Sequence, residues 1–236
     1  MTYKLLEEFR KLFQGKKYKH RISTQGDVIA GYLFEDLYDL GKSAKFCTAV
    51  KSQERVANRR NKQVGRTKRR GDGTFGEKVP HVEPGLPRGL AVAIGDVATI
   101  EIGAEVKIMA KAMVKQLDRV GGDMEKQVEA FKKHGENPIC VGIIGINRSP
   151  RYTSYERKAV WPTDGKEYKH PIQEADEVET RLRARLEHTW FDELIIIRFE
   201  VTNTSPYPFK WSNLKDTENH YGAALVRICR EYERRF

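Results

Sequence analysis

Hydrophobic residues recur along this chain with two different periods, which separates predicted helices from predicted strands. Apolar residues at helical spacing predict helices over 2–15, 23–43, 111–133, 171–190 and 220–236. Alternating or continuous apolar runs predict strands over 45–52, 90–110, 138–147 and 193–203. The chain is therefore expected to mix helices and strands throughout its length.

The order of these elements indicates the kind of sheet. The run PICVGIIGIN, residues 138–147, is almost continuously apolar, as in a strand covered on both faces. It follows a predicted strand and a predicted helix, so the three form a crossover unit with two parallel strands. We expect a single α/β domain over 1–236 with a mixed central sheet flanked by helices. Its core spans about 24–146, and 147–236 adds a strand and helices.

Charged residues interrupt one of the predicted strands. Within IGDVATIEIGAEVKIM, residues 94–109, five apolar residues alternate with a second set that includes Glu105 and Lys107. The apolar set is Ile100, Ile102, Ala104, Val106 and Ile108. Since successive side chains of a strand point to opposite faces, these five share one face, and Glu105 and Lys107 lie side by side on the other. A solvent-facing ion pair on an edge strand is the simpler explanation.

A second carboxylate changes this interpretation if the segment turns. Asp96 lies nine residues before Glu105, and a hairpin between Ala98 and Gly103 would bring the two together. In a straight strand they would be roughly 30 Å apart, at about 3.3 Å per residue. Two carboxylates beside a lysine offer oxygen ligands to Mg²⁺, which binds through one or two carboxylates and substrate phosphates. Such a metal activates water for attack on a phosphoryl group.

The same residues resemble a known family. Asp96 followed by Glu105-Val106-Lys107 is similar to the active-site motif of the PD-(D/E)xK nuclease superfamily, which includes restriction endonucleases, junction resolvases and mismatch-repair nicking enzymes. IGAEVK, residues 102–107, is closest in pattern to the mismatch-repair branch. The resemblance implies a restriction-endonuclease-like α-β-β-β-α-β core in which Asp96 and Glu105 bind Mg²⁺ (or Mn²⁺) and Lys107 serves the attacking water.

Two positions of the family pattern have more than one candidate. Many members add a carboxylate from the first core helix, and Glu35 lies about where it is expected, with Asp36 as its rival. Gly95 rather than proline precedes Asp96, and the spacing to Glu105 is short for the superfamily. The first acid could therefore instead be one of three residues in the preceding segment, namely Asp72, Glu77 or Glu83.

Basic residues are concentrated in one stretch. The chain has 236 residues and a formal charge of +10, and residues 51–70 contribute +8 of it with nine Lys/Arg and one Glu. Such a cluster binds phosphates with salt-dependent affinity, although a solvated loop or a targeting tract has the same composition. We expect DNA contacts from seven of these residues: Arg59, Arg60, Lys62, Arg66, Lys68, Arg69 and Arg70.

A second segment mixes basic and aromatic residues. Residues 147–171 include Arg148 and Arg151 together with Tyr152, Tyr155 and Trp161. This mixture suits a loop that grips phosphates and stacks on bases. A hairpin or lid that packs on the core through Trp161 is an equally good interpretation.

Other kinds of chemistry find little support. The three cysteines are far apart, and the six histidines form no HxxxH or HExxH motif, so a disulfide framework and a zinc hydrolase are not indicated. GDGTFGEK, residues 71–78, has the glycines of a phosphate-binding loop but Glu77 in place of its lysine, and we expect a mobile loop there. No signal peptide or apolar membrane span is apparent, which suggests a cytoplasmic protein.

These observations lead to one preferred function and its rivals. We expect an Mg²⁺-dependent endodeoxyribonuclease, and within that class a type II restriction-type enzyme that cuts duplex DNA as a homodimer, since cutting both strands needs two related sites. A repair or junction nuclease of the same superfamily is the nearest alternative. A nucleic-acid-binding module without catalysis, or a phosphatase with the same metal site, would also fit.

Overall fold

A computed structural model describes residues 2–20, 22, 24–58, 71–155, 160–161 and 171–236. The described residues form helices and strands in the following order: α1 Lys4–Lys11, α2 Thr24–Leu40, α3 Ala44–Ser52, β1 Arg55–Asn58, β2 Gly73–Lys78, β3 Val97–Met109, α4 Met113–His134, β4 Ile139–Asn147, β5 Tyr152–Thr153, β6 Val160–Trp161, α5 Pro171–Leu186, β7 Glu193–Val201, β8 Phe209–Trp211 and α6 Leu214–Arg235.

The main sheet is mixed, as predicted. Its strand order within the described residues is β1-β2-β3-β4-β7-β8. The β3–β4 and β4–β7 pairs are parallel, whereas β1–β2, β2–β3 and β7–β8 are antiparallel. The crossover unit is confirmed, because α4 connects two adjacent parallel strands. The centre of the sheet, β4, is buried along its whole length.

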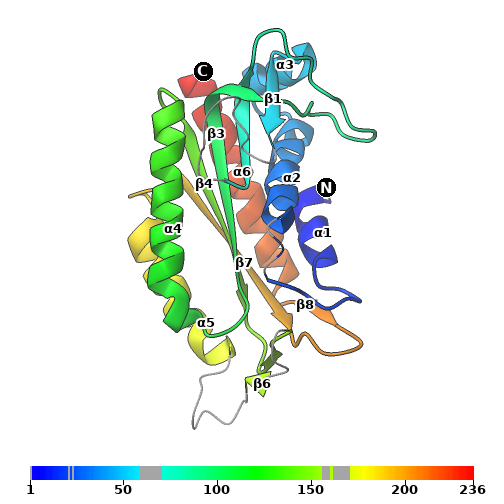
Figure 1. Ribbon diagram of the computed structural model, residues 1–236, viewed down its shortest axis with the longest axis vertical. Coiled ribbons are helices and arrows are strands. Elements are labelled where there is room, and N and C mark those ends of the chain that lie inside the picture. Colours follow the sequence, from blue (N-terminus) through cyan, green and yellow to red (C-terminus); the bar gives the residue numbers. More distant parts are fainter. Residues whose placement is uncertain (1, 21, 23, 59–70, 156–159, 162–170) are drawn as a thin grey trace.

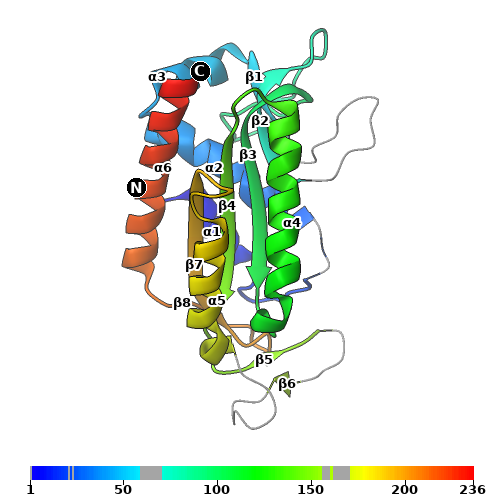
Figure 2. The same ribbon diagram turned by 90° about the vertical axis from the view of Figure 1, so that its left-hand side faces the viewer.

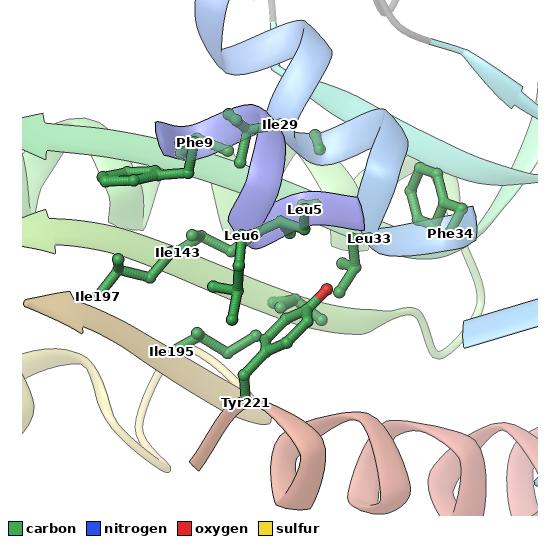
Figure 3. Packing of buried hydrophobic residues seen from close by; sticks show 14 of the residues in the cluster. Leu5, Leu6, Phe9, Ile29, Leu33, Phe34, Ile143, Ile195, Ile197 and Tyr221 are labelled. Carbon is green, nitrogen blue, oxygen red and sulfur yellow. The ribbon is translucent and has the colours of Figure 1, made fainter. Parts of the chain in front are cut away.

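Helices cover both faces of the sheet (Figures 1 and 2). One core joins α1, α2, α3 and α6 to one face, and the other joins α4 and α5 to the opposite face. Figure 3 shows part of the first core, in which Leu5, Leu6 and Phe9 of α1 lie among Ile143 of β4, Ile197 of β7 and Tyr221 of α6. The molecule is thus a helix–sheet–helix sandwich, with the two cores separated by β3, β4 and β7.

Strand β3 is continuous, so the predicted hairpin is wrong. It runs from Val97 to Met109 without a turn. Irregularity appears instead as a β-bulge: consecutive residues Phe75 and Gly76 of β2 pair with Ile102 and Ile100 of β3, which leaves Glu101 as an extra residue. A Cβ on Gly76 would lie 2.0 Å from the carbonyl oxygen of Thr99, so the bulge requires glycine there.

The bulge also changes which residues share a face. Ile102, Ala104 and Val106 belong to the core beneath α2 and α6, as predicted for one face. Ile100 belongs to the opposite core, beneath α4, because the extra residue reverses the alternation. The prediction that Ile100 lies on the same face as Ile102 is therefore wrong.

Residues 45–52, predicted to be a strand, belong to helix α3. The side chain of Ser43 accepts a hydrogen bond from the backbone N–H of Phe46 and caps the helix N-terminus. The helix ends at Gln53, which has a left-handed backbone conformation. Capping and the burial of Phe46 and Val50 outweigh the strand-like composition of KFCTAVKS.

Residues 71–78 are also more ordered than predicted. Instead of a mobile loop, residues 73–78 form strand β2, which pairs with both β1 and β3.

Across the part of the chain that the structure describes, no helix combines the length and apolar character needed to cross a membrane.

Candidate active site

The register between β2 and β3 brings an acid beside Glu105. Gly73 pairs with Ala104, so Asp72, which directly precedes β2, lies next to Glu105 across the antiparallel pair. The Asp72 carboxylate oxygen Oδ2 accepts a hydrogen bond from the backbone N–H of Val106 at 2.8 Å. Asp72 is therefore held against the Glu105-Val106-Lys107 segment by backbone pairing and by its own side chain.

A close approach by helix α2 confines the Asp72 carboxylate. A Cβ built on Gly26, near the N-terminus of α2, would lie 2.4 Å from the Oδ1 atom of Asp72. Only a residue without a side chain leaves room for the carboxylate at this position. The next residue, Asp27, is 4% exposed and raises the pKa of Asp72 through its charge, so it supplies a third acid to the neighbourhood.

Lys107 lies beside the carboxylates of Asp72 and Glu105. Its Nζ donates a hydrogen bond to Oε1 of Glu105. Burial lowers the pKa of Lys107, but Glu105, Asp72 and Asp123 together outweigh this effect, so the pKa is above its ordinary value. The ammonium group is therefore charged at neutral pH.

The pKa of the Asp72 carboxyl group is strongly raised. Burial, followed by the charge of Glu105, raises its pKa to about 7, although Lys107 and the Val106 N–H oppose this shift. Two carboxylates in one low-dielectric site repel each other when both are ionised. A divalent cation between them would relieve that repulsion, so Asp72 and Glu105 fit an Mg²⁺ or Mn²⁺ ion.

The number of acidic ligands is small. Among the residues that the structure describes, no group of three or more His, Cys, Asp or Glu side chains is arranged to hold a metal ion. Mg²⁺ nevertheless commonly binds through one or two carboxylates and completes its shell with water and substrate phosphates. Asp72 and Glu105 are the residues that would hold it here.

A cavity of about 370 Å³ opens over these side chains. Asp72, Glu105 and Lys107 line it together with residues from three other places. Helix α4 contributes Gln116, Arg119 and Asp123, the segment before α2 contributes Tyr18, His20 and Ile22, and the first turn of α2 contributes Gln25 and Gly26. The acids and the lysine are thus reached from solvent, as a site that acts on a substrate requires.

Helix α4 places a polar residue behind Glu105. The ring of Phe131 covers Gly103, where a Cβ would lie 2.4 Å from it. Since α4 runs antiparallel to β3, one helical turn back from Phe131, about 6 Å, corresponds to two residues forward on β3. This places Gln127 over Glu105 and Asp123 over Lys107. Gln127 is 1% exposed, and neither polar atom of its amide has a hydrogen-bond partner within the described part of the chain.

Asp96, predicted as the first metal ligand, is not part of this site. It precedes the N-terminal end of β3, whereas Glu105 lies near the other end of the same continuous strand. The earlier alternative of an acid within the preceding segment fits better, since Asp72 is the one that adjoins Glu105. Glu77 instead contacts Arg55, and Glu83 is absent from the cavity.

Glu35, predicted as the helix carboxylate, has a structural role instead. It is 1% exposed and accepts hydrogen bonds from the backbone N–H groups of Ala91 and Val92, the latter at 2.9 Å. Its rival Asp36 accepts bonds from the N–H groups of Lys4 and Leu5 and caps helix α1. Both predictions missed Asp27, eight residues before Glu35, which is the acid of α2 nearest the site.

The predicted nucleic-acid contacts are only partly described. Arg59, Arg60, Lys62, Arg66, Lys68, Arg69 and Arg70 lie outside the described residues. Arg148 forms an ion pair with Asp176 at 2.5 Å, and Arg151 is exposed. Neither arginine lines the cavity over Glu105.

Comparisons with known proteins add no relative. Neither models of protein families, nor curated proteins, nor solved structures gave a match to this chain. The function has to be inferred from the residues of the site and their geometry.

Proposed function

We propose that this protein is an Mg²⁺-dependent endonuclease that hydrolyses phosphodiester bonds of DNA. The observation that carries this proposal is the juxtaposition of Asp72, which directly precedes β2, with Glu105 and Lys107 of β3, within one cavity. With Asp72 as the first acid, the arrangement still resembles the PD-(D/E)xK pattern, because an acid on one strand faces an ExK segment on its neighbour. The strand order supports a restriction-endonuclease-like core.

Each of the three side chains has a role that follows from its surroundings. Asp72 and Glu105 would hold the divalent cation, whose positive charge stabilises the extra negative charge on a phosphodiester under attack. Lys107 is protonated, so it would hold the attacking water or a phosphoryl oxygen as a hydrogen-bond donor rather than remove a proton. Hydrolysis then forms a P–O bond to the water oxygen, breaks one ester P–O bond and leaves the departing oxygen protonated.

The preferred substrate is duplex DNA, cut by a type II restriction-type enzyme acting as a homodimer. The charge of +10 supports a polyanionic substrate, and the basic stretch at 51–70 immediately precedes Asp72 in sequence. Cutting both strands of a duplex needs two sites related by a twofold axis. A repair or junction nuclease would use the same three side chains on a different DNA structure.

The test is cleavage of plasmid and genomic DNA with Mg²⁺ or with EDTA. We expect discrete fragments that disappear with EDTA and with Asp72→Asn, Glu105→Gln or Lys107→Met. Asp96→Asn is the matched control, since it removes an acid at the far end of β3 and should leave cleavage unchanged.

Three results would contradict the proposal. Full activity of Asp72→Asn would show that Asp72 does not contribute to cleavage. Intact DNA that still binds the protein at low salt, with Mg²⁺ and with Mn²⁺, would indicate a binding module. Hydrolysis of 4-nitrophenyl phosphate without DNA cleavage would indicate a phosphatase.

A further inference from the structure

The cavity over Glu105 extends well beyond the three central side chains. It follows β3 past Lys107 to Ile108, Ala110 and Lys111. From Glu105 to the end of β3 at Met109 the chain extends roughly 13 Å, at about 3.3 Å per residue, and the cavity continues beyond that end. A cation and one phosphate group occupy only the first part of such a length, so the remainder is available to another part of the substrate.

The far end of the cavity has an aromatic floor. Tyr18 and Tyr152 line it and are almost fully buried, at 4% and 1% exposure. The hydroxyl of Tyr152 has no hydrogen-bond partner in the portion of the chain that is described. A buried hydroxyl without a partner is costly, so this atom is a candidate to bond a group that enters the cavity.

Cationic and aromatic side chains surround this floor. Lys111 donates a hydrogen bond from Nζ to Oγ of Ser154 at 2.5 Å, which holds its ammonium group near β5. The Nε2 atom of Gln116 donates to the carbonyl oxygen of Lys111 at 2.8 Å and so fixes the chain at this point. His20 is exposed and lies edge-on to Tyr155, with ring centroids 5.0 Å apart. Together they offer a positive charge for phosphate and an aromatic ring for stacking.

We propose that this end of the cavity is a distal subsite, formed by Tyr18, His20, Lys111 and Tyr152, for one unpaired nucleotide of the strand being cut. Lys111 binds the phosphate of that nucleotide, His20 stacks on its base and the Tyr152 hydroxyl bonds the base edge. The base has to be unstacked from its neighbours to reach Tyr152, so the strand must be single or locally opened here. This subsite rests on the nuclease function proposed above and adds a requirement for strand opening beside the cut.

The subsite predicts a step in the dependence of cleavage on substrate length. Once the cut position is known, oligonucleotides that contain it are shortened by one nucleotide at a time from each end. For the unaltered protein, kcat/KM should fall about tenfold when the nucleotide of the distal subsite is removed. Tyr152→Phe and Lys111→Met should lower kcat/KM on the longer substrates and cleave the shortest substrate as well as the unaltered protein does.

Matched controls separate this effect from a damaged fold. Lys115→Met removes an exposed lysine of α4 that does not line the cavity, and Tyr207→Phe removes a hydroxyl elsewhere; both should keep the length step. An equal loss on all lengths, or no loss on any, for Tyr152→Phe and Lys111→Met would overturn the subsite.

A binding measurement distinguishes failure of the subsite from failure of the nuclease function. Fluorescent single-stranded oligonucleotides of increasing length are titrated into the Glu105→Gln protein, where no cleavage is expected. A length-dependent gain in affinity that Tyr152→Phe abolishes would support the subsite even if the unaltered protein cuts no DNA. Affinity that is the same for Tyr152→Phe at every length would refute it.

Discussion

Glu101 and Glu105 lie four residues apart on β3 and are equally buried, at 4% exposure, yet their surroundings differ completely. Glu101 accepts hydrogen bonds from Nε of Arg55 at 2.6 Å and from the hydroxyl of Tyr232. Glu105 lies beside a second carboxylate, Asp72, and shares one lysine with it. Burial of an acid does not by itself mark a functional site.

The partners of the two glutamates explain the difference. A guanidinium and a hydroxyl neutralise and satisfy Glu101, so its surroundings are complete within the fold. Burial, and after it the charge of Glu105, raises the pKa of Asp72 to about 7, and Lys107 offsets this only in part. Protein groups balance the charge of Glu101, so Glu101 stabilises the fold. The excess negative charge at Asp72 and Glu105 would instead favour a bound cation.

The largest expected effect is loss of cleavage when Glu105 is replaced. Glu105→Gln keeps the shape of the side chain and removes its charge, so we expect the cleavage rate to fall by at least about 10²-fold. The measurement is the initial rate of plasmid cleavage, corrected for the folded fraction. Glu101→Gln, measured in parallel, should retain its rate per folded molecule; an equal loss would end the distinction between the two glutamates.

A pH-dependent stability should follow from Asp72. Its folded pKa of about 7 exceeds the ordinary value of 3.8, so the folded state binds its proton more tightly than the unfolded state does. Stability should therefore be greatest below about pH 4 as far as this group is concerned, and should fall by about 2–4 kcal/mol as the pH rises to above 7. Urea unfolding without divalent cation at pH 5 and pH 8 measures this difference.

Two comparisons isolate the Asp72 contribution to this profile. Asp72→Asn should abolish most of the fall, because the variant has no proton to lose. Addition of Mg²⁺ at pH 8 should stabilise the unaltered protein more than the variant. A pH profile that is identical in both proteins would show that Asp72 does not carry the strain.

A smaller effect, on stability alone, is expected at the other glutamate. Arg55→Met removes the cation bound to Glu101 and leaves a buried carboxylate with only the Tyr232 hydroxyl. Because the Arg55 side chain is 27% exposed, we expect a loss of about 1–3 kcal/mol rather than the full cost of breaking a buried pair. Urea unfolding gives the value, and Lys107→Met provides the contrast, since it should lower both stability and cleavage whereas Arg55→Met should lower stability alone.

The smallest effect is expected at Gln127, and its sign is opposite. Replacement by leucine removes a buried amide that lacks partners, so Gln127→Leu should raise the free energy of unfolding by about 1 kcal/mol. If the amide orients Glu105 when a cation is bound, the same variant should cleave more slowly and need more Mg²⁺ for half-maximal rate. Destabilisation by Gln127→Leu would show that the amide has partners in solution.

The fold was largely predictable because its determinants are local. The buried run at 138–147 and the helix before it indicated two parallel strands, and the sheet confirms them. The error at 45–52 arose because a short apolar segment fits a helix or a strand equally well, and the Ser43 cap decides between them. The continuous β3 was missed because a bulge, rather than a turn, accommodates Glu101.

The site was less predictable, since its geometry depends on pairing between strands. Glu105 and Lys107 were predicted as site residues from their spacing within one strand and from the resemblance to the ExK motif. Asp72 was one of several candidate acids, because neither segment alone determines the register of β2 against β3. Asp27 and Gln127 gave no usable signal, as each joins the site through the packing of a whole helix.

The bulge at Glu101 has an evolutionary consequence. It shifts the alternation of β3 by one residue. As a result the Glu101 side chain faces α6, whereas the Glu105 side chain is on the face of the sheet covered by α4. A single-residue insertion or deletion between them would exchange apolar and charged faces along the rest of the strand. Related sequences should therefore show hardly any change in the number of residues between positions 101 and 105.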